Sequence, residues 1–387
     1  MVTNCKYRKC AIIISVVFIL MASCSAGDDV TLVSFKLPDE ATHDLTELFR
    51  ISSPADGAFF SYIRNIHILS DGHLVVQNYP DHQLYELTPD GELVGIIGRE
   101  GRGPGEFIQT YMSHLAIDDS LHVFDFNNSR HQVFTRDEPG QWTYSRESAF
   151  QRVRLDGLKE QIPDRVVRST DGETFGLFRI HPTARDTLQA QYMYVSKVDQ
   201  NIEHAGDVSR LRLASELAIH RGENNSMSVI NNRRFKRSFY TFRPETDEVL
   251  LIQNTSNDIT VIDSSGKETV NGQLPYERFP VNRRSLDESL VNVNYSYAGM
   301  EEIVQDKLLD YEPYYRNVVL HDNRLWVNLA RSDSDKPNWV VTTLEGELLE
   351  AFHGPEEITE VTIHGNRMYG SVRDTDGAVY LVGYELN

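Results

Sequence analysis

The amino-acid sequence predicts an all-β fold, a six-bladed β-propeller with four-stranded antiparallel blades. Three observations support this prediction. Short runs of β-forming residues alternate with tight-turn sequences along most of the 387 residues. A unit of four such runs recurs six times, and the last copy has only three runs. Repeated units of this kind bury their two apolar faces only against neighbouring copies, which is typical of a radial array of sheets.

The first unit extends from Ile63 to Gly98. Its runs are separated by Asp71-Gly72, Tyr79-Pro80-Asp81 and Asp90-Gly91, which are turn sequences of antiparallel hairpins. The later units carry turns of the same kind. They begin near Met112, Arg165, Ser238, Tyr315 and Glu357.

The sixth unit lacks a fourth run, so the ring needs a strand from elsewhere to close it. The run from Val30 to Leu37 at the N-terminus is strand-like, and we expect it to complete the sixth blade. Two alternatives remain open at this point. Residues 208–237 could contain a seventh blade, or the chain could form two separate β domains.

Two insertions interrupt the repeats. In residues 275–313 a capping-box pattern, Ser285 to Glu288, precedes apolar residues at helical spacing that stop before Pro313. We expect short helices there, including one that contains Met300, Ile303, Val304 and Leu308. In residues 208–237 the stretch from Leu211 to His220 is a second candidate helix. Such helices would cover the edge or one mouth of the ring.

The N-terminus has the pattern of an export signal. Three cations, Lys6, Arg8 and Lys9, precede an apolar run from Ala11 to Ala22 that is too short to span a bilayer. The sequence Met21-Ala22-Ser23-Cys24 that ends this run resembles a bacterial lipoprotein signal. The resemblance implies removal of residues 1–23, lipidation of Cys24 and a polar tether over 24–29, followed by the propeller over 30–387. The alternative is an ordinary secretory signal or an uncleaved anchor.

Cleavage would change both the number of cysteines that remain and the net charge of the chain. Cys5 and Cys10 lie in the removed part, so Cys24 would remain alone and no disulfide is expected. The chain has 38 Lys and Arg against 57 Asp and Glu, a formal charge of −19, and loss of three cations makes it −22. This charge argues against nucleic-acid binding. We therefore expect the basic cluster Arg233-Arg234-Phe235-Lys236-Arg237 to pair with the protein's own carboxylates.

The junction of the first two units carries a family resemblance. The stretches Gly95–Phe107 and His114–Phe134 resemble the NHL type of propeller repeat, in which an Asp, an Asn and an Arg precede the third strand. Here these residues are Asp125, Asn128 and Arg130, a structural repeat motif. Together with the signal, the chain is similar to the six-bladed, TolB-like propeller lipoproteins of Bacteroidota. The resemblance implies an exported lipoprotein of the outer membrane, facing the periplasm or the surface, and implies no activity.

Arginines recur at the predicted mouth of the ring. One follows the second strand in three units: Arg179, Arg331 and Arg373. Arg99 and Arg102 of the Gly-rich loop are expected near the same face. Guanidinium groups match the oxygens of carboxylates, sulfates and phosphates, so these five residues are the candidate ligand site. In the alternative interpretation they join blades through buried carboxylates.

Signatures of catalysis and of cofactors are absent. Gly98, Gly101, Gly103 and Gly105 lead into a strand with no Lys-Ser/Thr pair, so they form neither a phosphate-binding loop nor a dinucleotide fingerprint. No zinc or serine-hydrolase motif occurs. Asp333 and Asp335 are weak candidates for calcium, the one cofactor that remains open. Propeller lactonases gather calcium ligands from separate blades, a set that leaves no local spacing.

Several aromatic residues fall near predicted strand ends. They are Tyr79, Tyr192, Trp339 and the pair Tyr314-Tyr315. Aromatic faces at the mouth would suit sugar rings or peptides, whereas most aromatics in a propeller fill the core between blades.

These observations favour a binding module over an enzyme. We expect a lipid-anchored propeller of the cell envelope that binds a glycan, a peptide or an envelope protein, with no nucleic-acid partner. The alternative is a hydrolase or lyase at the mouth, with calcium as its one candidate cofactor. The sequence identifies no catalytic residue.

Overall fold

A computed structural model of the protein divides the chain into two units, residues 1–32 and 33–387. It describes residues 37–387 apart from 56–57, 80, 109, 116–117, 126–129, 150–160, 169–171, 181–191, 200–201, 203, 213–217, 222–226, 231–234, 244, 264, 275–299 and 332–334. All that follows concerns the second unit. The signal and Cys24 lie outside the described residues.

Six four-stranded antiparallel sheets form the blades of the described part, as predicted. Blade 1 is β2 (Tyr62–Ile68), β3 (Leu74–Tyr79), β4 (Leu84–Leu87) and β5 (Leu93–Ile97). Blade 2 is β8 (Thr110–Leu115), β9 (Leu121–Asp125), β10 (Arg130–Glu138) and β11 (Gln141–Ala149). Blade 3 is β12 (Gln161–Arg168), β13 (Thr174–Ile180), β14 (Tyr192–Val198) and β15 (His204–Arg212).

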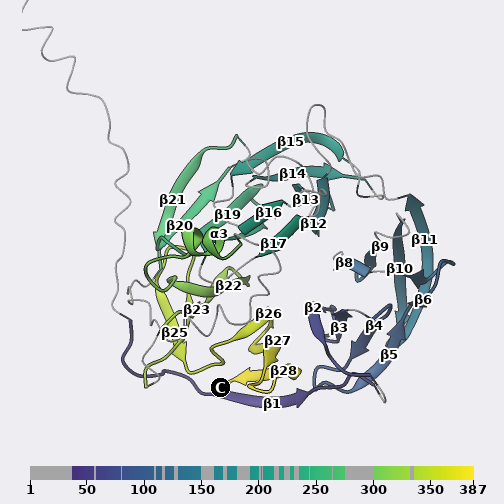
Figure 1. The fold of residues 1–387 in the computed structure, drawn as a ribbon, viewed down its shortest axis with the longest axis horizontal. Coiled ribbons are helices and arrows are strands. Elements are labelled where there is room, and N and C mark those ends of the chain that lie inside the picture. The colour runs from purple at the N-terminus through teal and green to yellow at the C-terminus, as the bar shows by residue number, and fades with distance from the viewer. Residues whose placement is uncertain are drawn as a thin grey trace, which may run out of the picture. The chain divides into compact units, whose positions relative to one another are not determined.

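The second half of the unit continues the pattern (Figure 1). Blade 4 is β18 (Ser238–Arg243), β19 (Glu248–Gln253), β20 (Asp258–Ile262) and β21 (Glu268–Gln273). Blade 5 is β22 (Tyr315–His321), β23 (Arg324–Leu329), β24 (Trp339–Thr342) and β25 (Leu348–Phe352). Blade 6 is β26 (Ile358–His364), β27 (Arg367–Arg373), β28 (Val379–Leu386) and the N-terminal β1 (Leu45–Ile51). One strand of each blade lies innermost in the ring. These six innermost strands are β2, β8, β12, β18, β22 and β26 (Figure 1).

An N-terminal strand closes the last blade, but it is not the predicted one. Strand β1 pairs antiparallel with β28, with Leu45 opposite Leu386. The prediction that Val30 to Leu37 is this strand is wrong, because β1 takes the place beside β28 and Leu37 is not in a strand. Val30 to Lys36 lie outside the described residues. Phe49 anchors β1, since its ring lies 6.2 Å from that of Tyr369 and packs into the core between blades 6 and 1.

Alternating side chains of each blade fill two neighbouring cores. In β3, Val76 packs in one cluster with Tyr369 of blade 6. The preceding residue, Val75, packs in another cluster with Leu121 of blade 2. Successive side chains of a strand point to opposite faces, so one blade seals both of its neighbours. This arrangement explains the near-continuous apolar runs of the second strands.

The insertions differ in part from the prediction. The expected helix from Leu211 to His220 is wrong, because β15 continues through Arg212 as the partner of β14. A two-stranded hairpin, β16 (Ala218–Arg221) with β17 (Met227–Ile230), follows, so this region is not a seventh blade.

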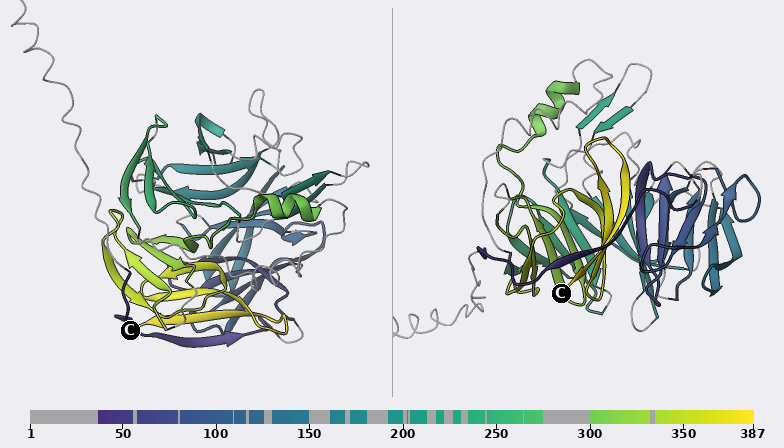
Figure 2. Two further views of the ribbon diagram at one scale, coloured as in Figure 1. Left: turned by 60° about the vertical axis from the view of Figure 1, so that its left-hand side comes forward. Right: turned by 90° about the horizontal axis from the view of Figure 1, so that it is seen from below.

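The predicted helix of the other insertion is present as α3 (Met300–Lys307), the one helix of the described part of the chain. Glu301 and Glu302 in its first turn and Lys307 in its last complement the helix dipole, and Val304 is fully buried. Helix α3 contacts β16 (Figure 2). Ser285 to Glu288 lie outside the described residues.

Candidate functional site

The innermost strands share an irregularity just after they begin. In five blades the pairing with the second strand shifts by one or two residues near this point. The residues passed over by the shift are Arg64, Tyr111, Asp164, Arg316 and the pair Glu360-Val361. A β-bulge re-aims the side chain of its extra residue. Four of the five bulges therefore place a charged residue near the beginning of an innermost strand, a part of the ring that we call the rim.

Glu360 is held in a strained conformation at the rim. Its φ is 51°, a left-handed value that is rare for a residue other than glycine. Such a conformation costs on the order of 1–3 kcal/mol and persists only where the surrounding structure holds it. The carboxyl is half-buried, and this burial raises the pKa of Glu360 from 4.5 to about 7.

Charges from two other blades and from the residue before blade 4 act on this carboxyl. Arg64 comes from blade 1, Asp164 and Arg165 come from blade 3, and Arg237 immediately precedes blade 4. The three guanidiniums favour the ionised form of Glu360 and the carboxylate of Asp164 opposes it, yet desolvation by burial is the largest effect. We call these five residues the inner-strand cluster. Residues that are distant in sequence thus act electrostatically on one carboxyl of the rim.

Aromatic side chains contact two of the three arginines of the cluster. The Arg64 guanidinium lies 5.1 Å from the ring centre of Tyr79 and 6.0 Å from that of Tyr62, and these two tyrosines are cross-strand partners. The Arg237 guanidinium lies 5.9 Å from the ring centre of Phe239. Burial lowers the pKa of Arg237 and raises that of Tyr62. On the other side of the cluster, Tyr240 Oη donates a hydrogen bond of 2.5 Å to Asp164 Oδ2.

The predicted mouth arginines are not gathered in one place. Arg373 is exposed and close enough to Tyr62 to lower its pKa, so it borders the inner-strand cluster. Arg99 forms an ion pair of 2.7 Å with Glu106 inside its own loop. Arg331 is buried in blade 5, where Nη1 donates to the Pro337 carbonyl.

The other two candidate arginines are Arg102 and Arg179. Arg102 is exposed on the Gly-rich loop. The backbone of Arg179 lies in β13 opposite Ile162, near the start of β12. The side chain of Arg179 is not among those that the structure describes.

The Gly-rich loop and the repeat motif serve packing. A Cβ on Gly98, whose φ is 75°, would lie 2.1 Å from the Phe107 ring, so this close approach requires glycine. Arg130 Nη1 and Nη2 donate to the carbonyls of Gly103 and Glu106, and buried Asp125 accepts from the Ile108 backbone. These bonds fix the loop to blade 2. The third motif residue, Asn128, lies outside the described residues.

No metal centre is assembled in the part of the chain that the structure describes. Asp335 is exposed, and Asp333 lies outside the described residues. No group of three His, Cys, Asp or Glu side chains suited to an ion occurs among the described residues. The helix found there is neither long nor apolar enough to cross a membrane.

The aromatic residues divide between core and surface. Trp339, Tyr314 and Tyr315 are buried, whereas Tyr79 remains 36% exposed. The side chain of Tyr192 is not among those that the structure describes.

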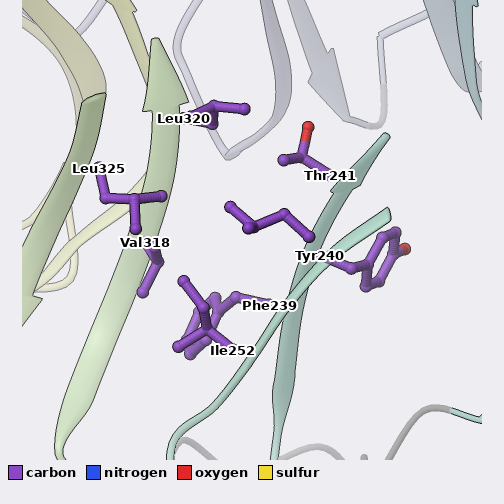
Figure 3. A pocket seen from close by; sticks show the side chains of 8 residues that line it. Phe239, Tyr240, Thr241, Ile252, Val318, Leu320 and Leu325 are labelled. Atoms are coloured by element: carbon purple, nitrogen blue, oxygen red, sulfur yellow. The ribbon is translucent and has the colours of Figure 1, made fainter. Parts of the chain in front are cut away.

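Two hollows lie beside blades 4 and 5, and neither is the site. A crevice of about 20 Å³ lies between β18 and β22, and the Tyr240 ring points away from it (Figure 3). That volume suits a single water molecule. A second pocket of about 150 Å³, next to Asn254 and Tyr311, is smaller than ordinary ligand sites.

Sequence reasoning missed most of the inner-strand cluster. One weak signal was present: a charged residue interrupts the apolar runs YIRNIHI, QIPDRVVR and ITEVTIH near their beginning. Of the basic cluster, Arg237 acts electrostatically on the carboxyl of Glu360, while Arg233 and Arg234 lie outside the described residues.

Comparisons with known proteins agree on the fold. Residues 54–137, which include blade 1 and most of blade 2, match a family described as a 6-bladed beta-propeller. None of the curated proteins matches the sequence.

Solved structures that resemble the chain share little sequence with it. A protein from Bacteroides fragilis described as exported has 14% identity and a TM-score of 0.48 over 92% of this chain and 100% of its own. An inactive variant of virginiamycin B lyase from Staphylococcus aureus has 10% identity and a TM-score of 0.42, covering 89% and 100%. A gluconolactonase from Xanthomonas campestris has 12% identity and a TM-score of 0.43, covering 89% of both chains.

Proposed function

We propose that this protein is an exported β-propeller that binds an anionic ligand at the rim, through the inner-strand cluster. One observation carries the proposal: Arg64, Arg165 and Arg237, from three parts of the ring, all act electrostatically on the half-buried carboxyl of Glu360. Preorganised guanidiniums are well suited to carboxylates, sulfates and phosphates.

The charge balance of the cluster supports a ligand over a purely structural role. Three guanidiniums face two carboxyls, so the cluster carries a charge of 3 − 2 = +1, or +2 when Glu360 is protonated. This excess lies in a chain of net charge −19. For comparison, Arg136 of blade 2 joins two blades by binding buried Glu86 of blade 1 at 2.6 Å and Asp71 at 2.8 Å.

Anion titration tests this proposal. The full chain in detergent is titrated with sulfate and with acetate, and binding should saturate. Arg237→Gln should weaken binding about tenfold, because it removes one unit charge from a half-desolvated site. The matched control is Arg50→Gln, which removes an exposed arginine paired with Glu47 on β1 and should bind like the wild type. Equal affinities in all three proteins, or no saturable binding, would refute the proposal.

A second candidate function, hydrolysis or elimination, is favoured by Glu360 itself. A carboxyl with a pKa of about 7 suits general acid–base catalysis at neutral pH. Turnover of lactones or glycosides that disappears in Glu360→Gln, while the anion still binds, would support an enzyme. Binding without turnover in the wild type would support the binding module.

The proposed anchor rests on the sequence around Cys24. Lipid on this cysteine would hold the propeller at the membrane, because several acyl chains bind far more firmly than one. Cell fractionation should find the wild type with membranes and Cys24→Ser in the soluble or unprocessed fraction. Equal distribution of the two proteins would favour an ordinary signal.

A further inference from the structure

Three exposed aromatic side chains lie in or just before blade 1, and two of them, Tyr62 and Tyr79, are cross-strand partners. Phe59 is 70% exposed, Tyr62 is 46% exposed and Tyr79 is 36% exposed; we call them the aromatic shelf. Among the described residues the one other large aromatic with comparable exposure is Tyr311. Exposed aromatic groups that lie together mark surfaces that meet a ligand.

Hydrogen bonds from one side chain fix the backbone that carries the shelf. Fully buried Asn78 accepts hydrogen bonds from the backbone of Ser61 and Tyr62, at 3.0 and 3.3 Å. Its amide group donates to the Phe59 carbonyl at 2.9 Å and to Asp81 at 2.8 Å. One side chain therefore fixes the backbone that carries two of the three rings. Preorganisation of this kind reduces the entropy lost on binding.

The shelf is continuous with the inner-strand cluster through Arg64. This guanidinium lies over the rings of both Tyr62 and Tyr79, and it also acts on Glu360. A ligand that places an apolar ring face on the shelf would thus present its charged group to the arginines. The carboxyls of Glu360 and Asp164 would accept hydrogen bonds from hydroxyl groups on the same ligand.

We propose that the ligand of the anion site is an acidic saccharide, that is, a sugar ring that bears a carboxylate. This inference rests on the proposed function. The C–H face of a pyranose packs on aromatic rings, and its hydroxyls donate to carboxyls. A carboxylate on the ring would be attracted by the three guanidiniums of the cluster. A more highly charged phosphate would meet repulsion from the two carboxyls at the same point.

Matched probes test the inference on the full chain. Trigalacturonic acid is compared with its methyl ester, which keeps the rings and loses the charge, and with sulfate, which has no ring. Uridine monophosphate represents a stacking ligand with a phosphate. The acid should bind about tenfold more tightly than each of the other three. Tyr79→Ala should weaken binding of the acid about tenfold, Tyr79→Phe should restore it, and Tyr311→Ala should bind like the wild type.

The outcomes separate this inference from the proposed function. Sulfate binding as tight as that of the acid, tighter binding of the nucleotide, or an unchanged affinity in Tyr79→Ala would overturn the saccharide and leave the anion site standing. Failure of every anion to bind would overturn both.

Discussion

Tyr240 Oη donates a hydrogen bond of 2.5 Å to Asp164 Oδ2, and this bond joins the innermost strand of blade 4 to the bulge of blade 3. Asp164 also lies in the electrostatic surroundings of Glu360. The inner-strand cluster is therefore tied into the ring and is not a set of independent surface charges.

Tyr240→Phe should destabilise the fold by about 1 kcal/mol, because it removes one partly buried hydrogen bond and leaves the ring in place. Denaturant unfolding measures the change. Tyr380→Phe is a suitable control, since its bond to Asp374 is longer, at 3.2 Å, and stays within blade 6. A smaller loss in Tyr240→Phe than in Tyr380→Phe would contradict this role.

Stability should depend on pH through Glu360. Its pKa in the folded protein is raised from 4.5 to about 7, so between these values the folded state binds more protons than the unfolded state. Its contribution is therefore complete below pH 4.5 and lost as the pH rises through 7, at most about 3 kcal/mol. Glu360→Gln should remove this decline, and Glu357→Gln, an exposed neighbour, should keep it. Parallel stability curves for wild type and Glu360→Gln would show that the carboxyl does not titrate in this range.

The contact between blades 1 and 2 predicts the opposite dependence. Burial alone would raise the pKa of Glu86, but bonds from His73, Trp142, Arg136 and the Gly140 backbone outweigh it, and the pKa is lowered. Glu86 should therefore stabilise the fold above pH 4.5 and lose this effect as the pH falls below that value.

Arg136→Met should cost about 3–5 kcal/mol at neutral pH, because it removes the main cation from buried Glu86. The comparison is Arg99→Met, because the Arg99 side chain is 77% exposed in its ion pair with Glu106, and the melting temperature of this variant should stay near that of the wild type. Similar melting temperatures for the two variants would contradict the importance of burial.

Closure of the ring predicts a further effect. Phe49→Ala should destabilise the protein by about 2–4 kcal/mol and expose β28, since Phe49 holds β1 against the core shared by blades 6 and 1. Hydrogen exchange of the β28 amides should increase with it. Phe59→Ala, at an exposed position, should change neither quantity. Protection of β28 that survives the loss of Phe49 would mean that β1 is held by other contacts.

The repeat was readable from the sequence because its turns are local. Asp71-Gly72 and Asp90-Gly91 lie at hairpins, with both glycines at a φ of 86°. The closing strand was misplaced because β1, LTELFRI, exposes polar residues on one face, whereas the N-terminal run around Val30 is more uniformly β-forming. Pairing with β28 decides between them, and pairing is not local.

The site was largely unreadable for the same reason. Arg64, Asp164 and Glu360 come from bulges of three different innermost strands, and only the ring fold brings the first two within electrostatic range of Glu360. Neither the register shift nor the raised pKa of Glu360 leaves a motif in the sequence. Arg331 and Arg373 occupy comparable positions in the repeat, yet one is buried in its blade and the other is exposed.

The pH dependence of anion affinity tests the central claim most directly. Ionisation of Glu360 adds a negative charge to the inner-strand cluster, so the affinity for sulfate should fall about tenfold between pH 6 and pH 8. In Glu360→Gln it should stay constant over that range. A flat profile in the wild type, or the same decline in Glu360→Gln, would show that the anion does not bind at this cluster.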